Sequence, residues 1–212
     1  MTTFLFLLAI VPSIILHEIS HGYVANLCGD PTAKNAHRLT LNPLRHIDPF
    51  GTILLPFLLI ATGLPAFGWA KPVPVNVARL RNPRSQSLYV SLAGPLTNIV
   101  LSAIAFVYVR YEIHHASVAT LNSNYSFFTF MVYLGVVNMI LAVFNLLPIP
   151  PLDGSAIIER FVPVRHLPRY YQMRARALPF LMAALILNAL TLHIGTTWLS
   201  SLEIHWQELA QN

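Results

Sequence analysis

Long apolar stretches alternate with short polar connections along most of the chain. Four of these stretches are long enough to cross the hydrocarbon core of a bilayer, which takes about 20 mostly apolar residues in a helix. They run over Thr2–Leu27, Leu88–Val109, Phe127–Leu147 and Ala177–Leu199. The pattern therefore predicts an all-α polytopic membrane protein with about four spanning helices.

A fifth apolar stretch, Gly51–Trp69, is interrupted by residues that break helices. It contains Pro56, Gly63, Pro65 and Gly68, and such interruptions are typical of a broken or re-entrant membrane segment. Basic residues flank the stretch at both ends. We therefore expect it to enter and leave the membrane on the same side.

Two polar connections contain short stretches that favour extended structure. Ala36–Leu41 and Val73–Val77 alternate or include β-branched side chains. Pro72 and Pro74 limit the second stretch to the edge of a sheet. We expect short β-strands here, on the cytoplasmic side of the helices.

Composition and charge agree with a membrane location. Hydrophobic residues make up 55% of the chain and charged residues only 10%, against about 25% charged residues in soluble domains. The net charge is +5, and the basic residues lie in the connections Gly29–Pro49, Lys71–Ser87 and Arg160–Arg176. This distribution suits anionic lipid rather than nucleic acid, and it places these connections in the cytoplasm. We expect residues 1–212 to form one membrane-embedded domain of the cell membrane.

The first apolar stretch ends in a pattern of metal-binding residues. Residues 17–21 read HEISH, a match to H-E-x-x-H, in which His17 and His21 share a helix face beside Glu18. Positions four apart lie about 40° apart around the helix axis, so both rings can reach one ion. Cys28 is the sole cysteine, so any metal must bind to histidines and carboxylates. A buried histidine pair without a metal is the alternative.

Asp153 is the candidate for a third metal ligand. A catalytic zinc site usually has three protein ligands and leaves the fourth position to water. Asp153 lies in the sequence NLLPIPPLDG at 145–154, where three prolines break the helix and allow an aspartate to turn inward. Taken alone, an Asp-Gly pair favours an ordinary turn. The histidines of HEISH and Asp153 can lie at the same side of the membrane only if Gly51–Trp69 enters and leaves on one side. A full crossing by this segment would put them at opposite sides.

Three motifs together resemble the site-2 protease family of intramembrane zinc metalloproteases. They are HEISH at 17–21, AGPLTN at 93–98 and NLLPIPPLDG at 145–154, and the resemblance covers most of the chain. It implies one Zn²⁺ per chain with His17, His21 and Asp153 as ligands. It also implies that Glu18 is the catalytic carboxylate. We expect no room for the PDZ or CBS domains of larger members.

The function that this resemblance implies is cleavage of transmembrane segments of other membrane proteins, at a site toward the cytoplasmic side. Zinc would activate a water molecule, and Glu18 would accept its proton as the general base. The family's polar positions match Asn98 and Asn145. These amides are expected either to bind the substrate backbone and the oxyanion or to bridge helices.

Two other functions stay open at this point. A zinc-dependent membrane hydrolase could act on another substrate class, such as a lipid or a prenylated protein terminus, because a metal and a base do not select the amide. A non-enzymatic metal-binding or transport module would instead use its intramembrane charges to carry ions or hold helices.

Overall fold

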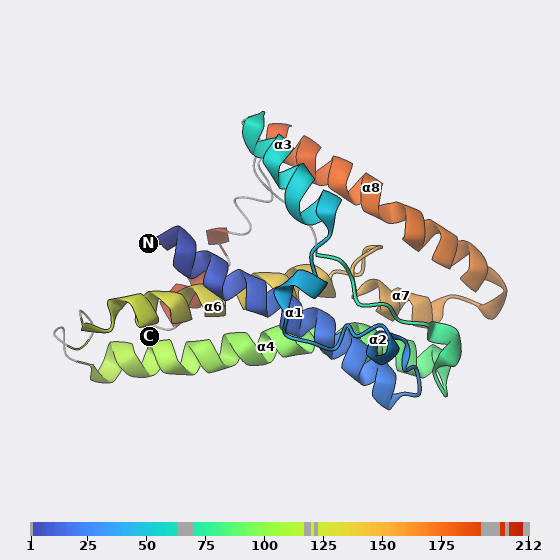
Figure 1. Ribbon diagram of the computed structural model, residues 1–212, viewed down its shortest axis with the longest axis horizontal. Coiled ribbons are helices and arrows are strands. Elements are labelled where there is room, and N and C mark those ends of the chain that lie inside the picture. Colours follow the sequence, from blue (N-terminus) through green and yellow to red (C-terminus); the bar gives the residue numbers. More distant parts are fainter. Residues whose placement is uncertain are drawn as a thin grey trace. The chain divides into compact units, whose positions relative to one another are not determined.

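The computed structural model describes residues 2–62, 70–116, 120, 123–191, 200–201 and 204–209 (Figure 1). Its α-helices are α1 (Thr2–Leu27), α2 (Thr32–Asn35), α3 (Leu55–Ala61), α4 (Pro83–His115), α6 (Tyr125–Leu146), α7 (Ser155–Phe161) and α8 (Leu167–Thr191). A π-helix, η2 (Pro49–Leu54), leads into α3, and three short 3₁₀ turns are η1 (Pro43–Arg45), η3 (Val77–Arg79) and η4 (Val164–His166). The chain divides into two compact units, unit 1 (Met1–Ser13 and Pro95–Asn212) and unit 2 (Ile14–Gly94).

Three helices of the described chain are long and apolar enough to cross a membrane. They are α1, from Thr3 onward, α4 and α6, and they match the first three predicted spans to within one residue at each end that falls short. The 33 residues of α4 extend over about 50 Å, which exceeds the hydrocarbon core of about 30 Å. This helix must therefore tilt or project from the membrane. The predicted polytopic, helical class of the protein is confirmed.

The other two predicted membrane segments are described only in part. Ala177–Leu199 begins within α8, and its residues 192–199 lie outside the described residues. In Gly51–Trp69, the described part consists of η2 and α3, and residues 63–69 lie outside it. Whether each crosses or re-enters the membrane stays a prediction.

The predicted β-strands are wrong, because the described residues form no strand. At Ala36–Leu41 the chain instead leaves α2 through a tight helix end. The N–H of Arg38 donates to the carbonyl of Ala33 at 3.0 Å. The N–H of His37, whose φ is 52°, donates to the carbonyl of Lys34 at 3.0 Å. These are the two hydrogen bonds of a Schellman motif, and they occupy groups that a strand would have paired.

The second predicted strand, Val73–Val77, falls in an extended segment, residues 70–76, that also lacks a strand partner in the described chain. Pro72 and Pro74 have no N–H to donate. The N–H of Val73, which lies between them, donates to Oε2 of Glu18 at 2.8 Å. The two prolines and the side-chain acceptors of Val73 and Asn76 thus interrupt the regular row of N–H groups that a strand would offer.

Asp30 fastens the extended segment to the end of α1. The residue is fully buried. One carboxylate oxygen accepts from the N–H and the hydroxyl of Thr32, and the other accepts from the N–H of Asn76 at 2.6 Å. Burial acts to raise the pKa of Asp30, but these hydrogen bonds and the charge of Arg79 outweigh it and lower the pKa below the ordinary 3.8. The folded protein thus holds Asp30 in its ionised form.

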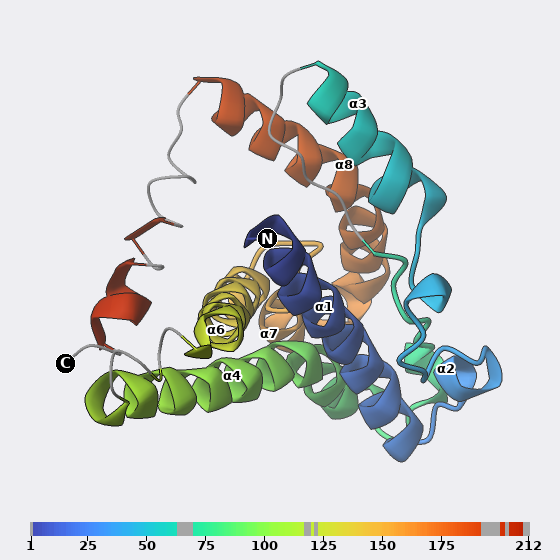
Figure 2. The ribbon, with the colours of Figure 1, turned by 60° about the vertical axis from the view of Figure 1, so that its left-hand side comes forward.

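Unit 1 packs around a cluster shared by α4, α6 and residues 204–209. Its buried members are Ala105, Val109, Met131, Val136 and Trp206. Figures 1 and 2 both show α4 and α6 side by side. A Cβ on Gly135 would lie 2.1 Å from the ring of Trp206, so glycine is needed for this close approach. The indole N–H donates to the hydroxyl of Ser102 at 3.2 Å.

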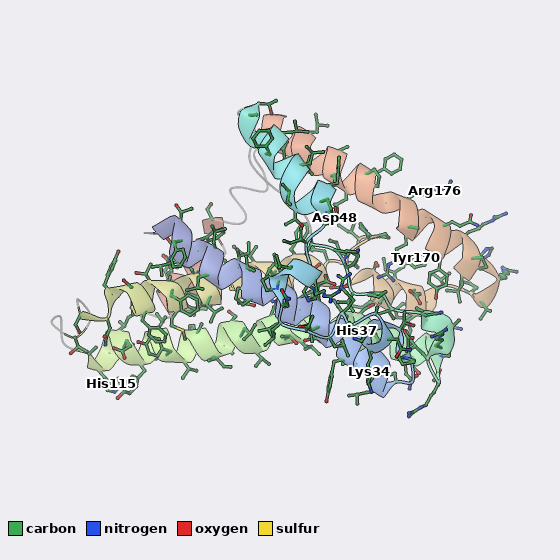
Figure 3. The ribbon with its side chains drawn as sticks, in the orientation of Figure 1. Lys34, His37, Asp48, His115, Tyr170 and Arg176 are labelled. Atoms are coloured by element: carbon green, nitrogen blue, oxygen red, sulfur yellow. The ribbon has the colours of Figure 1, made fainter. Side chains whose placement is uncertain are left out.

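Polar contacts join α7 to α8 in unit 1. The hydroxyl of Tyr170, labelled in Figure 3, donates to the carbonyl of Ser155 at 2.7 Å. Glu159 is buried; it accepts from the hydroxyl of Tyr171 at 2.7 Å and pairs with Arg174 at 3.3 Å. Burial and the bond to Glu159 raise the pKa of Tyr171 to about 12. These contacts fix the start of α7, which directly follows Asp153 and Gly154.

Replacing Asp30 with asparagine should lower the free energy of unfolding by about 1–3 kcal/mol at neutral pH, because buried donors lose their charged partner. Folding lowers the pKa of Asp30, so its stabilising contribution is complete above 3.8 and is lost as the pH falls through the folded-state value. Thermal unfolding in detergent should therefore show a difference between wild type and Asp30→Asn that shrinks in acid. A difference of equal size at every pH would contradict this account.

Candidate metal centre

The two histidines of α1 present their ring nitrogens to each other. Nε2 of His17 lies 3.1 Å from Nε2 of His21, and the rings meet edge to face at 85°. Both side chains are buried. Two nitrogens that bind one tetrahedral zinc ion at about 2.0–2.1 Å lie about 3.3 Å from each other. The spacing therefore fits a shared metal ion.

The backbone of α4 orients His21. Nδ1 of His21 lies 2.7 Å from the carbonyl oxygen of Val90. A carbonyl only accepts, so Nδ1 carries the proton and Nε2 keeps its lone pair. Histidine ligands of metals commonly donate their other N–H to a carbonyl in this way. The hydrogen bond from His21 to Val90 thus selects the tautomer that can bind a metal through Nε2.

Gly94 of α4 leaves the space in which the two rings lie. A Cβ at this position would come 2.4 Å from Nε2 of His21 and 2.7 Å from Nε2 of His17. Contacts this short require one of the groups to move, and here both affected atoms are candidate ligand atoms. The glycine of the AGPLTN motif therefore forms one wall of the candidate metal centre.

Glu18 is held by the extended segment described above. The residue is half-buried, and its Oε2 accepts from the N–H of Val73 at 2.8 Å. One helical turn later, a Cβ on Gly22 would lie 2.6 Å from Cγ1 of Val73 and 2.7 Å from Cδ2 of Leu39. Gly22 thus allows the segment to approach α1 closely enough for Val73 to fix one oxygen of the Glu18 carboxylate.

Asp153 lies in unit 1, in a tight turn between α6 and α7. The N–H of Gly154 donates to the carbonyl of Asn145 at 2.7 Å, and the N–H of Ala156 donates to the carbonyl of Asp153 at 3.0 Å. A Cβ on Gly154 would lie 2.2 Å from the carbonyl oxygen of Leu146. The Asp-Gly pair forms a turn, as its sequence alone favours, and this turn leaves Asp153 half-buried.

The two candidate asparagines make different hydrogen bonds in unit 1. Asn98 is fully buried, and its amide nitrogen donates to Oδ1 of Asn138 at 2.7 Å. Asn138 in turn donates to the hydroxyl of Ser13 at 2.7 Å, so this chain of bonds links α4, α6 and α1. Asn145 is half-buried and donates to the carbonyl of Leu141, one turn earlier in its own helix, at 3.0 Å.

Several residues that support the candidate centre were not among the predicted site residues. Gly22 and Gly94 act through the absence of a side chain, and Val73 and Val90 act through backbone groups. Of these, only Gly94 carried a signal, because it belongs to AGPLTN. Asn138 could have been found as a polar residue in the middle of an apolar helix.

The chain matches the family model described as Peptidase family M50 over residues 5–123 and 111–188. It is 44% identical over 161 residues to "Putative zinc metalloprotease YwhC" of Bacillus subtilis (strain 168), covering 74% of the chain and 68% of that relative. "Putative zinc metalloprotease Rip2" of Mycolicibacterium smegmatis is 34% identical over 149 residues, and that of Mycobacterium tuberculosis is 34% identical over 151 residues. Both alignments cover 69% of the chain and 53% of the relative. No solved structure matches the chain.

The chain therefore belongs to peptidase family M50, the site-2 protease family that its three motifs resemble. Together with its long apolar helices, this membership makes it a multi-pass membrane peptidase. The chain spans about half the length of the mycobacterial relatives and about two thirds of the Bacillus relative.

Replacing Gly94 with alanine should weaken metal affinity by about 10- to 100-fold, the usual cost of disturbing groups that orient ligands. The reason is the overlap of the new methyl group with His17 and His21. Gly22→Ala is the matched control, because its methyl group would meet Val73, Leu39 and Ala33 instead. Metal content after dialysis, measured by mass spectrometry, should fall in Gly94→Ala alone. Equal metal affinity in both variants would show that Gly94 does not form a wall of the centre.

Proposed function

We propose that the protein is an intramembrane zinc metalloendopeptidase that cleaves transmembrane segments of other membrane proteins. The observation that carries this proposal is the pair of facing Nε2 atoms, 3.1 Å apart, in a helix apolar enough to cross a membrane and directly beside Glu18. Membership of the M50 peptidases supports the hydrolase class, and the names of the relatives support zinc.

His17, His21 and Asp153 are the proposed ligands of one zinc ion. The two histidines fit by their spacing, by the tautomer of His21 and by the room left by Gly94. Asp153 is assigned from its motif, and this assignment makes residues 1–212 one functional domain. When bound, zinc lowers the pKa of a water ligand toward about 7 and polarises the scissile carbonyl.

Glu18 is the proposed general base. Its carboxylate would accept a proton from the attacking water and deliver it to the leaving amine. The hydrogen bond from Val73 holds one oxygen of this carboxylate in place, which reduces the number of orientations that the base must sample. By the positive-inside rule, the basic connections that flank α2 and precede α4 support a cytoplasmic position for this end of α1.

A membrane-spanning substrate must unwind before cleavage, because its helical carbonyls are occupied by its own hydrogen bonds. We assign substrate binding to Asn145, which is half-buried beside the turn that holds Asp153. Asn98 is assigned the bridging role, since it is fully buried and its amide is bonded to Asn138.

Glu18→Gln should keep zinc and lose about 10²–10⁴ in the rate of cleavage of a model transmembrane substrate, the usual contribution of a general base. Asp153→Ala should lose zinc as well as activity. Glu208→Gln is the control, because this carboxylate is well exposed, and it should leave both properties unchanged. The proposal fails if Glu18→Gln cleaves the transmembrane substrate at the wild-type rate. It also fails if the protein and its variants hydrolyse lipid but not this substrate.

Alanine substitutions of Asn145 and Asn98 should have different effects on activity and stability. Asn145→Ala should reduce kcat by about 10²-fold while thermal stability changes little, as expected for loss of a donor to the oxyanion. Asn98→Ala should cost about 1–3 kcal/mol of stability, because it removes the donor to the buried Oδ1 of Asn138. Thermal unfolding and cleavage kinetics on the same preparations provide the comparison. If Asn98→Ala reduced kcat and Asn145→Ala reduced stability, the substrate-binding and bridging roles would have to be exchanged.

A further inference from the structure

A basic pocket lies in unit 2, away from the histidine pair in sequence. Its volume is about 560 Å³, and it is lined by Lys34, His37, Leu39, Thr40, Asn42 and Arg45. Lys34 belongs to α2 and His37 directly follows the end of that helix; both are labelled in Figure 3. No carboxylate belongs to this lining, and Lys34 and Arg45 form no ion pair within the described part of the chain. Two cations thus face a pocket in which no described lining residue carries a negative charge.

The walls of this basic pocket are ordered by local hydrogen bonds. The side chain of Asn42 accepts from the N–H of Leu44 at 3.0 Å, which shapes η1. Nε2–H of His46, a buried residue, donates to the carbonyl of Thr40 at 2.9 Å. His37 occupies the left-handed position at the end of α2. The pocket is therefore a shaped part of the fold rather than a loosely solvated loop.

The third strong base of the same connection has a different use. Arg38 is buried, and its guanidinium donates to the carbonyl of Lys71 at 2.7 Å. It stabilises the extended segment and does not line the pocket. Lys34 and Arg45, in contrast, are exposed. The fold thus uses one base internally and presents the other two to an outside anion.

Two apolar side chains stand beside these cations. Leu41 is 67% exposed and Leu44 is 73% exposed, and both lie next to residues that line the pocket. The connection ends at Pro49, directly before the apolar segment Gly51–Trp69. Cations and apolar side chains near a membrane surface match a molecule with a phosphate and acyl chains. We propose that this basic pocket binds the headgroup phosphate of an anionic phospholipid, with Leu41 and Leu44 against its acyl chains.

Binding of lipids to the purified full chain in detergent tests this proposal without any assay of proteolysis. Native mass spectrometry with phosphatidylglycerol and phosphatidylcholine should show tighter binding of the anionic lipid. Lys34→Gln/Arg45→Gln should weaken phosphatidylglycerol binding by about tenfold or more, given the attraction of each basic residue to anionic lipid. Arg169→Gln/Arg176→Gln is the matched control, because it removes the same charge from exposed positions of α8, and it should bind as wild type does.

Two further arms separate a lipid from a free anion. Leu41→Ser/Leu44→Ser should weaken phosphatidylglycerol binding while leaving competition by inorganic phosphate unchanged. The proposal is overturned if phosphatidylglycerol binds Lys34→Gln/Arg45→Gln as tightly as wild type, or if the α8 control weakens binding equally. It is also overturned if inorganic phosphate displaces the lipid fully at equal concentration and the leucine changes have no effect, since the site would then be one for a free phosphate.

Discussion

The arrangement of unit 2 depends on one requirement: polar groups at the end of an apolar helix need partners. A carboxylate or an imidazole in such a place is costly unless another group satisfies it. Here the partners are backbone groups of later segments, the N–H of Val73 for Glu18 and the carbonyl of Val90 for His21. Backbone partners are well suited to this task, because they bring no further charge and are positioned by their own local structure.

Close approach between segments makes these backbone partners available. Gly22 and Gly94 stand where any larger residue would push a neighbour away, one toward the extended segment and the other toward the imidazoles. Asp30 then holds the far end of the extended segment through the N–H of Asn76. Two glycines and two carboxylates, those of Glu18 and Asp30, thus hold neighbouring segments together as backbone pairing would in a sheet. They lie next to the candidate metal centre.

Features that follow from the local pattern of residues could be predicted from the sequence. Features that depend on contacts between distant segments could not. Apolar length identified three helices able to cross a membrane, and the spacing of His17 and His21 on one helix face predicted that two candidate ligand atoms lie together. The β-branched residues near Val73 suggested a strand, but Pro72 and Pro74 have no N–H and the N–H of Val73 donates to the Glu18 carboxylate instead. Likewise, the bond from Asn98 to Asn138 joins residues 40 positions apart, which no local pattern encodes.

The distance in sequence between the polar groups of α1 and their partners also sets an order of events during synthesis. The partner of Glu18 follows 55 residues later and that of His21 follows 69 residues later. At about 5–20 residues per second, the ribosome needs roughly 3 to 14 seconds to supply both. During this interval the nascent α1 relies on water for its carboxylate and imidazoles, which favours keeping its polar end at the membrane surface until α4 has been made.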